Sequence, residues 1–214
     1  MNYVLYGEEQ YLLSQSLDRI VKTHVSDKND LNCIVYDANT TDLEVILEDA
    51  MTIPFFSDCK VIEVYHANFL SSSNDKSIDT SALEHYLDHP METTVLILIG
   101  DFEKLDARKK IVKKVQKTCK VLQYRKLDEQ GKVQYVNDQI KKRGLHVDQD
   151  AIAMLLKRLP LDISTIQKEF DKLELYGGNI TSELVSKLVS RPLEEDVFQL
   201  VDAVVKKNLK LAFH

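Results

Sequence analysis

The fold of this chain is decided by the stretch Thr93-Thr94-Val95-Leu96-Ile97-Leu98-Ile99-Gly100. Its aliphatic run is short for a helix and is typical of a strand that is buried on both faces of a parallel sheet. Other short runs of apolar and β-branched residues share this character: residues 3–6, 33–36, 61–65 and 121–123. The chain therefore contains a set of predicted strands, of which 95–99 is expected to be fully buried.

Helical spacing of apolar residues separates these runs. The predicted helices are centred on residues 11–21, 43–50, 83–87 and 111–115. Strands that alternate with helices indicate βαβ units, in which helices cover both faces of a mostly parallel sheet. The sequence thus predicts an α/β domain of the parallel-sheet class over residues 1–124.

The pattern changes at Leu127, because every later periodic stretch is helical. The predicted helices span residues 127–143, 148–159, 162–176 and 181–189. Gly144, Pro160 and the pair Gly177-Gly178 stand where the first three of these should end. We expect a small helical domain over residues 125–192.

A new amphipathic stretch follows Pro192. Its apolar positions include Val197, Phe198, Val201 and Val205, and no glycine or proline interrupts it. This spacing predicts a helix over residues 195–213. We interpret residues 193–214 as the start of a third, helical domain that the chain does not complete.

The composition excludes several classes of protein. Of the 214 residues, 44% are hydrophobic and 29% are charged, which is ordinary usage for a globular protein. The N-terminus does not have the order of a signal peptide, and no apolar run has the length of a membrane span, so we expect a cytoplasmic protein without membrane contact. Cys33, Cys59 and Cys119 form no CxxC pair, which argues against a thiolate metal site. The net charge of −6 argues against binding nucleic acid through bulk electrostatics.

The turn after the first strand tests the hypothesis of a nucleotide-binding protein. A phosphate-binding loop there needs glycines, a lysine and a serine or threonine. The chain has Gly7-Glu8-Glu9-Gln10 instead, and carboxylates at a helix start favour the helix dipole but repel a triphosphate. We therefore expect no cofactor and no catalytic residue, and a degenerate P-loop-type ATPase stays as an alternative.

Two other groups of polar residues are candidate sites. His85 and His89 have the i, i+4 spacing of a metal pair, but the glutamate of an HExxH motif and a third ligand are missing, so no metal is expected. A basic cluster occupies the predicted helix at residues 106–118: Arg108, Lys109, Lys110, Lys113, Lys114 and Lys117. A solvated helix face is the favoured interpretation. The alternative is a DNA-binding module, in which Arg108, Lys109, Lys113 and Lys117 contact DNA or an acidic partner.

The segment Ile53-Pro54-Phe55-Phe56-Ser57 is the most unusual of the chain. Pro54 disfavours helical geometry at Ile53, so the preceding helix should stop there and a turn should carry the phenylalanines. In a generic sequence, two such rings more often fill the core beneath a sheet edge. The functional alternative is an exposed aromatic pair, a kind of anchor that dominates protein interfaces.

Several segments together resemble the delta subunit family of the bacterial DNA polymerase III clamp loader. They are Val4-Leu5-Tyr6-Gly7-Glu8-Glu9, Pro54-Phe55-Phe56-Ser57, Thr93–Leu98, Asp106–Lys110, the helix with Glu169, Lys172, Leu173 and Tyr176, Ile180-Thr181 and Val197–Ala203. Each segment is weak alone, but their order and spacing are specific. The resemblance extends over nearly the whole chain.

This resemblance implies a RecA-like, AAA+-type sheet domain, a small helical lid and a collar that joins the subunits of a ring. It implies a subunit without a working nucleotide site, which helps to open the sliding clamp for loading onto primed DNA. The clamp-binding residues of the family fall on Phe55 and Phe56, preceded by Pro54. The implied partners are the sliding clamp (beta), the tau/gamma and delta prime subunits through the collar, and primed DNA only within the replisome-associated complex.

Overall fold

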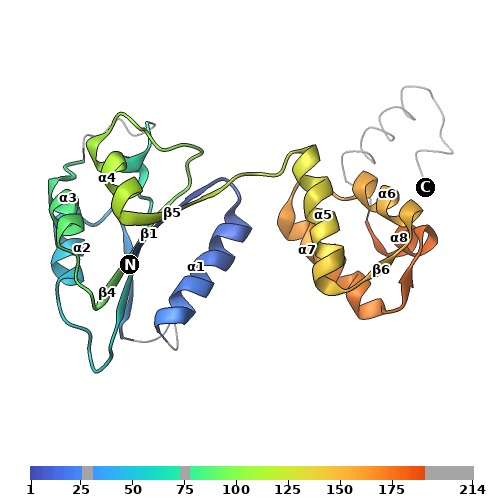
Figure 1. Ribbon diagram of the computed structural model, residues 1–214, viewed down its shortest axis with the longest axis horizontal. Coiled ribbons are helices and arrows are strands. Elements are labelled where there is room, and N and C mark those ends of the chain that lie inside the picture. The colour runs from blue at the N-terminus through green and yellow to red at the C-terminus, as the bar shows by residue number, and fades with distance from the viewer. Residues whose placement is uncertain (26–30, 73–77, 191–214) are drawn as a thin grey trace. The chain divides into compact units, whose positions relative to one another are not determined.

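The computed structural model describes residues 1–25, 31–72 and 78–190 of the chain. These residues form two compact units (Figure 1). The sheet unit comprises residues 1–126, and the helical unit begins at Leu127. The predicted start of a third domain at 193–214, with its helix over 195–213, lies outside the described residues.

A parallel five-stranded sheet forms the centre of the sheet unit, with the strand order β2-β3-β4-β1-β5. The strands are β1 (Asn2–Gly7), β2 (Cys33–Asp37), β3 (Lys60–Tyr65), β4 (Thr94–Gly100) and β5 (Cys119–Tyr124). Each lies where an apolar run predicted it. Every residue of β4 is buried, because β3 and β1 flank this strand and helices cover both of its faces.

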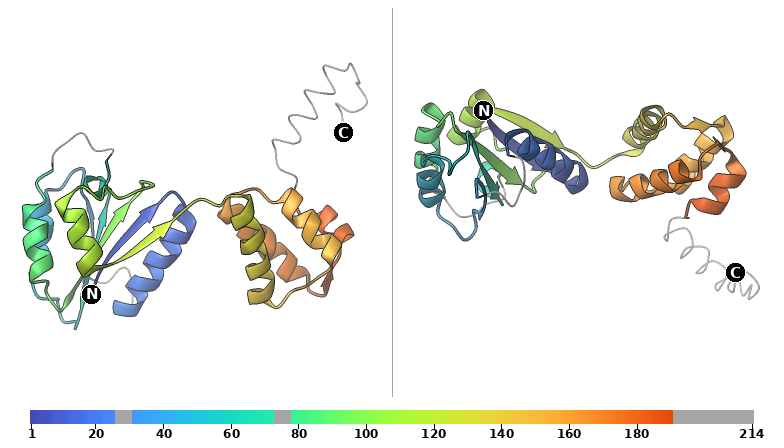
Figure 2. Two further views of the ribbon diagram at one scale, coloured as in Figure 1. Left: turned by 45° about the horizontal axis from the view of Figure 1, so that its top comes forward. Right: turned by 90° about the horizontal axis from the view of Figure 1, so that it is seen from below.

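Helices cover both faces of the sheet, as Figure 2 shows. On one face lies α1 (Gln10–His24), which buries Leu13, Leu17 and Val21 against Leu5 and Ile97. On the other lie α2 (Leu43–Ala50), the 3₁₀ turn Asn68–Leu70, α3 (Ser81–Asp88) and α4 (Lys110–Thr118). The predicted α/β class, a parallel sheet domain with a helical unit after it, is confirmed.

The helical unit contains α5 (Glu129–Arg143), α6 (Gln149–Arg158), α7 (Ile163–Tyr176) and α8 (Ser182–Leu188). Their apolar faces meet around Leu155, Ile166 and Phe170, which are fully buried. Gly144 ends α5 with a left-handed conformation at φ 63°, which glycine adopts without steric cost. Each predicted helix agrees with the observed one to within about two residues.

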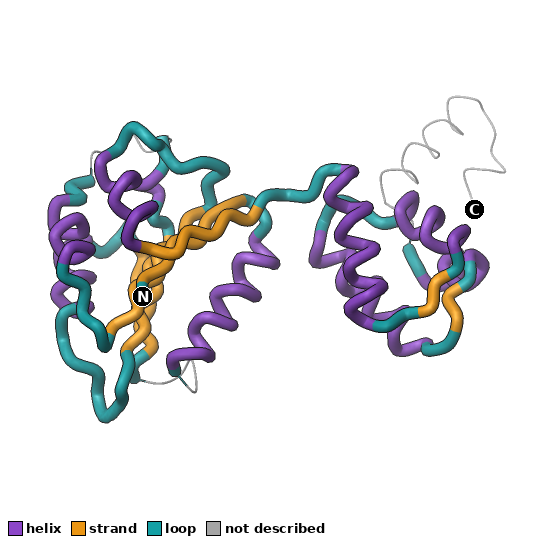
Figure 3. Tube along the Cα trace, viewed as in Figure 1, coloured by secondary structure: helices purple, strands orange, loops and turns teal. Residues whose placement is uncertain are grey.

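A short strand pair in the helical unit was not predicted. Strands β6 (His146–Val147) and β7 (Asn179–Ile180) pair in parallel and are drawn in orange in Figure 3. The pairing continues where the Asp148 N–H donates to the Ile180 carbonyl at 3.0 Å. Two residues per strand are too few to produce a visible alternation in the sequence.

None of the helices in the described part of the chain combines the length and hydropathy that crossing a membrane requires.

Candidate functional site

The turn between β1 and α1 holds carboxylates where nucleotide-binding proteins place a phosphate loop. Glu9 is buried and caps α1, because its side chain accepts the N–H of Tyr11 at 3.3 Å. Glu8 pairs with Lys126 at 3.6 Å. Gly7 has φ 139°, and a Cβ there would stand 1.9 Å from the Tyr124 carbonyl oxygen, so this glycine serves the close approach of β5. The two carboxylates of this turn therefore form contacts within the chain.

The two histidines of α3 lie near each other, with ring centroids 6.1 Å apart. Within residues 1–25, 31–72 and 78–190, no group of three His, Cys, Asp or Glu side chains is arranged to hold a metal ion. The structure therefore adds no third ligand to His85 and His89.

Fewer side chains of the basic cluster are free to contact a partner than the sequence indicated. The helix starts only at Lys110, so Arg108 and Lys109 precede it, which corrects the expected span of 106–118. Arg108 pairs with Asp106 at 2.8 Å and holds the pKa of that carboxyl at about 2, well below its usual range. Lys109 donates to the carbonyls of Phe69 and Ser71 at 2.9 and 2.7 Å.

The helical cations of α4 divide into two groups. Lys110 pairs with Glu84 at 2.7 Å and Lys114 pairs with Asp88, both on α3. Lys113 and Lys117 stay exposed, one turn apart. Only these two of the four residues considered for DNA contact present their charge without a described partner.

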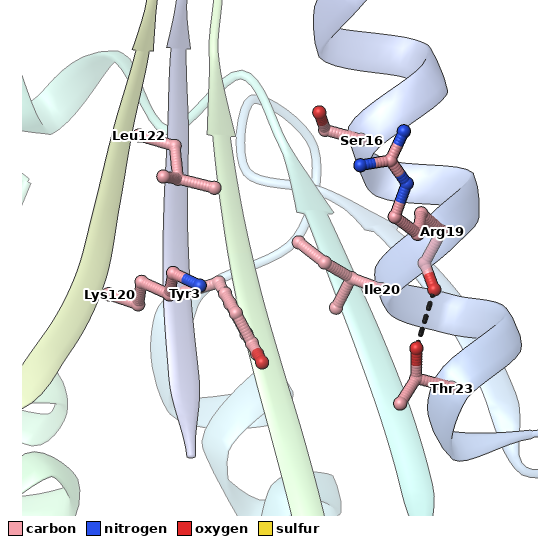
Figure 4. A pocket seen from close by; sticks show the side chains of 7 residues that line it. All are labelled: Tyr3, Ser16, Arg19, Ile20, Thr23, Lys120 and Leu122. Carbon is pink, nitrogen blue, oxygen red and sulfur yellow. Dashed lines mark hydrogen bonds between the residues drawn. The ribbon is translucent and has the colours of Figure 1, made fainter.

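A pocket of about 240 Å³ lies between α1 and the strands β1 and β5 (Figure 4). Arg19 and Lys120 line it together with the hydroxyl-bearing side chains of Tyr3, Ser16 and Thr23. The strand residues among them stand near the amino ends of β1 and β5. The pocket is therefore separate from the turn that follows the carboxyl end of β1.

The loop between α2 and β3 carries the largest exposed apolar side chains of the sheet unit. We call residues 51–59 the aromatic loop. Phe55 is 60% exposed, Phe56 95% and Ile53 80%, whereas Pro54 is half-buried. The two phenylalanine rings meet edge to face with centroids 4.6 Å apart. The expected exposure of the aromatic pair is confirmed, and the interpretation of both rings as core is wrong.

Helix α2 ends at Ala50, earlier than the stop expected at Ile53. The Thr52 hydroxyl donates to the Asp49 carbonyl at 2.9 Å, which satisfies a carbonyl at the helix end. Pro54 then follows, and a proline at this point prevents the helix from resuming. The loop consequently begins three residues before the proline.

Two buried polar residues hold the aromatic loop, and no sequence signal pointed to either. Asn32, only 3% exposed, accepts the N–H of Phe55 at 2.6 Å and donates to its carbonyl at 2.9 Å. Lys60, 2% exposed, pairs with the Asp49 carboxylate at 3.0 Å and donates to the Thr52 hydroxyl at 2.6 Å. It also donates to the Asp49 carbonyl. The start of the loop and the backbone of Phe55 are thus fixed to the sheet unit.

The aromatic loop lies before β3, at the edge of the sheet where the parallel strands begin. The turn Gly7–Gln10 follows β1 at the opposite edge, where parallel sheets usually bind nucleotides. The exposed aromatic pair is therefore a surface of its own. Exposed aromatic rings with a polar surround mark protein contacts more often than sites of chemistry.

Fold and site together define the class: an α/β protein with a parallel five-stranded sheet, carboxylates in the turn after β1 and an exposed aromatic loop at the opposite edge of its sheet. The family described as DNA polymerase III, delta subunit, matches residues 3–125. The chain belongs to this family.

Two relatives agree with this assignment. DNA polymerase III subunit delta of Bacillus subtilis (strain 168) is 31% identical over 213 residues, which is 96% of this chain and 61% of the relative. The solved structure of the Bacillus subtilis DNA clamp loader delta protein (YqeN) matches with a TM-score of 0.82 at 30% identity. That match covers 99% of this chain and 65% of the other. The chain thus spans less than two thirds of either relative.

Proposed function

We propose that this chain binds a sliding clamp through Phe55 and Phe56 and helps to open the clamp for loading onto primed DNA. The observation that carries the proposal is the exposure of both rings on a loop whose backbone is held in place. Membership of the delta subunit family and the similarity to a solved clamp loader delta protein support it. In this proposal Pro54 contributes by preventing α2 from continuing into the loop.

The proposed work is differential binding, without bond chemistry. A binding protein shifts the equilibrium between a closed and an open ring only by the difference between its affinities for the two forms. Burial of two phenylalanine side chains contributes roughly 3–6 kcal/mol of gross hydrophobic stabilisation before the costs of association. If part of this binding free energy is gained only with the open ring, the fraction of clamps that are open increases.

In the proposed assembly each part of the chain has its own role. The sheet domain (1–124) contacts the clamp, the helical domain (125–192) is the lid, and residues from 193 begin the collar that contacts tau/gamma and delta prime. DNA is reached only within that complex. The pairing of Arg108 and Lys109 inside the sheet unit disfavours a separate DNA-binding module.

The proposal is tested by the release of clamp from DNA. Clamp loaded on circular DNA is mixed with this chain without nucleotide, and the clamp that stays on the DNA is measured over time. We expect release to accelerate with the unchanged chain and with Leu175→Ala, which alters an apolar side chain that is 87% exposed on α7. Release should return to its spontaneous rate with Phe55→Ala/Phe56→Ala. Equal acceleration by the double variant would refute the role of the pair.

A further inference from the structure

Asn32 and Lys60 are buried polar residues whose side chains serve the aromatic loop instead of the sheet. Asn32 stands directly before β2, and its own carbonyl accepts the N–H of Val61 at 2.7 Å, which fixes it to β3. Its side-chain amide then binds both backbone groups of Phe55. This places a rigid connection between the sheet and the residue that carries the first ring.

Lys60 provides the corresponding connection at the start of the loop. Its ammonium group has three donors, and three oxygens receive them: the Asp49 carbonyl, the Asp49 carboxylate and the Thr52 hydroxyl. The Tyr36 hydroxyl donates to the other oxygen of the Asp49 carboxylate at 3.0 Å. The end of α2 is therefore tied to the first residue of β3, across the whole span of the loop.

The rings themselves cannot account for the conformation of the loop. Phe56 is 95% exposed, and its backbone has φ 47°, a region that residues other than glycine, asparagine and aspartate rarely adopt. Neighbouring structure must impose such a conformation. Asn32 binds the backbone of Phe55, the residue before Phe56. Lys60 joins the end of α2 to the first residue of β3.

We propose that Asn32 and Lys60 are positioning residues, which hold Phe55 and Phe56 in their binding conformation before the clamp arrives. The inference rests on the proposed function. A loop ordered in advance loses less conformational entropy on association, so the anchors raise affinity without touching the partner. Uncovering the loop in an assembly would then be enough to make it competent, because no refolding of the loop is required.

Asn2 offers a matched control for Asn32. It is 4% exposed in the same sheet unit, and its side chain accepts the backbone N–H of Leu96 at 3.0 Å, far from the loop in sequence and on another strand. Asn2→Ala and Asn32→Ala each remove a buried asparagine that satisfies a backbone group. A general loss of stability should therefore affect both variants, and a positioning role only one.

The experiment measures the affinity of the full chain for its cognate clamp and the hydrogen exchange of residues 51–59 in the free chain. We expect Asn32→Ala to weaken clamp binding at least about tenfold, which corresponds to about 1.4 kcal/mol, and to speed exchange in the loop. Asn2→Ala should leave both quantities unchanged. Asn32→Asp keeps the acceptor for the Phe55 N–H but sets a buried carboxylate against the Phe55 carbonyl oxygen, so it should also speed exchange in the loop and serves as the second variant if Asn32→Ala does not fold. Lys60→Gln should also speed exchange in the loop.

Phe55→Ala/Phe56→Ala, measured in the same assay, separates the two proposals. If this variant loses binding but Asn32→Ala binds as the unchanged chain does, or no more weakly than Asn2→Ala, the positioning role is refuted alone. If the double variant binds normally, the proposed function itself fails. Unchanged exchange of residues 51–59 in Asn32→Ala would also refute the positioning role.

Discussion

Phe56 combines a positive φ of 47° with 95% exposure, so its backbone is strained while its side chain contributes little burial to the fold. Such strain persists where the surrounding structure imposes it, often at binding loops. A residue selected for stability alone would be glycine at this position. An exposed phenylalanine at this strained position is what the proposed clamp contact would require.

Replacement of Phe56 by glycine tests this interpretation. Glycine adopts positive φ without a Cβ clash. The free energy of unfolding of Phe56→Gly should therefore be about 1 kcal/mol higher than that of Phe56→Ala. Both variants should lose clamp affinity. Urea denaturation of the two variants measures the difference, and a less stable glycine variant would show that the positive φ does not exist in solution.

The residue scale also shows the limit of prediction from sequence. Exposure of Phe55 and Phe56 was predicted because the segment resembles a family, whereas the residues alone favoured a buried pair. Asn32 was missed because its partner lies 23 positions away, and a single asparagine before a strand has no distinctive pattern. Lys60 was missed because a lysine beside a turn usually faces water. Long-range polar contacts of this kind become visible only in the folded chain.

At the scale of elements, the strands and helices of the sheet unit followed from periodicity because burial determines them. The aliphatic run Val95–Ile99 of β4 indicated a strand that is covered on both faces, and the neighbouring strands followed from their β-branched runs. The start of α4 was placed too early, since Asp106 accepts the N–H of Arg108 at 3.1 Å and forms a turn there. The pair β6–β7 was missed because it depends on the contact between two loops.

Arg143 joins α5 to α7 through several charge-assisted hydrogen bonds. Its guanidinium donates to Asp171 at 2.7 Å and to Glu174 at 2.6 Å, and it lies 5.7 Å from the centre of the Phe170 ring. Lysine cannot reproduce this fork and stacking geometry. We expect Arg143→Lys to lower the free energy of unfolding by about 1–2 kcal/mol, as chemical denaturation would measure.

Lys142 is the control for that change. It is exposed on the same helix, and no described residue forms an ion pair with it. Lys142→Ala should change stability by less than about 0.5 kcal/mol. Equal effects of the two substitutions would mean that the Arg143 contacts do not stabilise the helical unit.

At the scale of the molecule, buried phenols make the sheet unit sensitive to alkaline pH. Burial, followed by the charge of Glu63 and a hydrogen bond to it, raises the pKa of Tyr65 to about 12. Burial likewise raises the pKa of Tyr86 to about 12, and that of Tyr6 and Tyr36 in the same direction. An unfolded tyrosine titrates near about 10.

The sign of the effect follows from these values. A folded pKa above the unfolded one means that the neutral phenol stabilises the folded state below about pH 10, and that this contribution is lost as the pH rises through about 12. Tyr6, Tyr36, Tyr65 and Tyr86 all lie in the sheet unit. Amide exchange followed by mass spectrometry between pH 9 and 12 should therefore show the sheet unit opening first. Earlier opening of the helical unit would contradict this.

The central claim is that the aromatic pair binds a clamp and is not needed for folding, and the affinity of Phe55→Ala/Phe56→Ala for the cognate clamp tests it most directly. Because the rings are 60% and 95% exposed, the double variant should melt within a few degrees of the unchanged chain. Its affinity should fall at least about a hundredfold, or roughly 3 kcal/mol. Normal affinity together with a collapsed melting temperature would return both rings to the core and contradict the account.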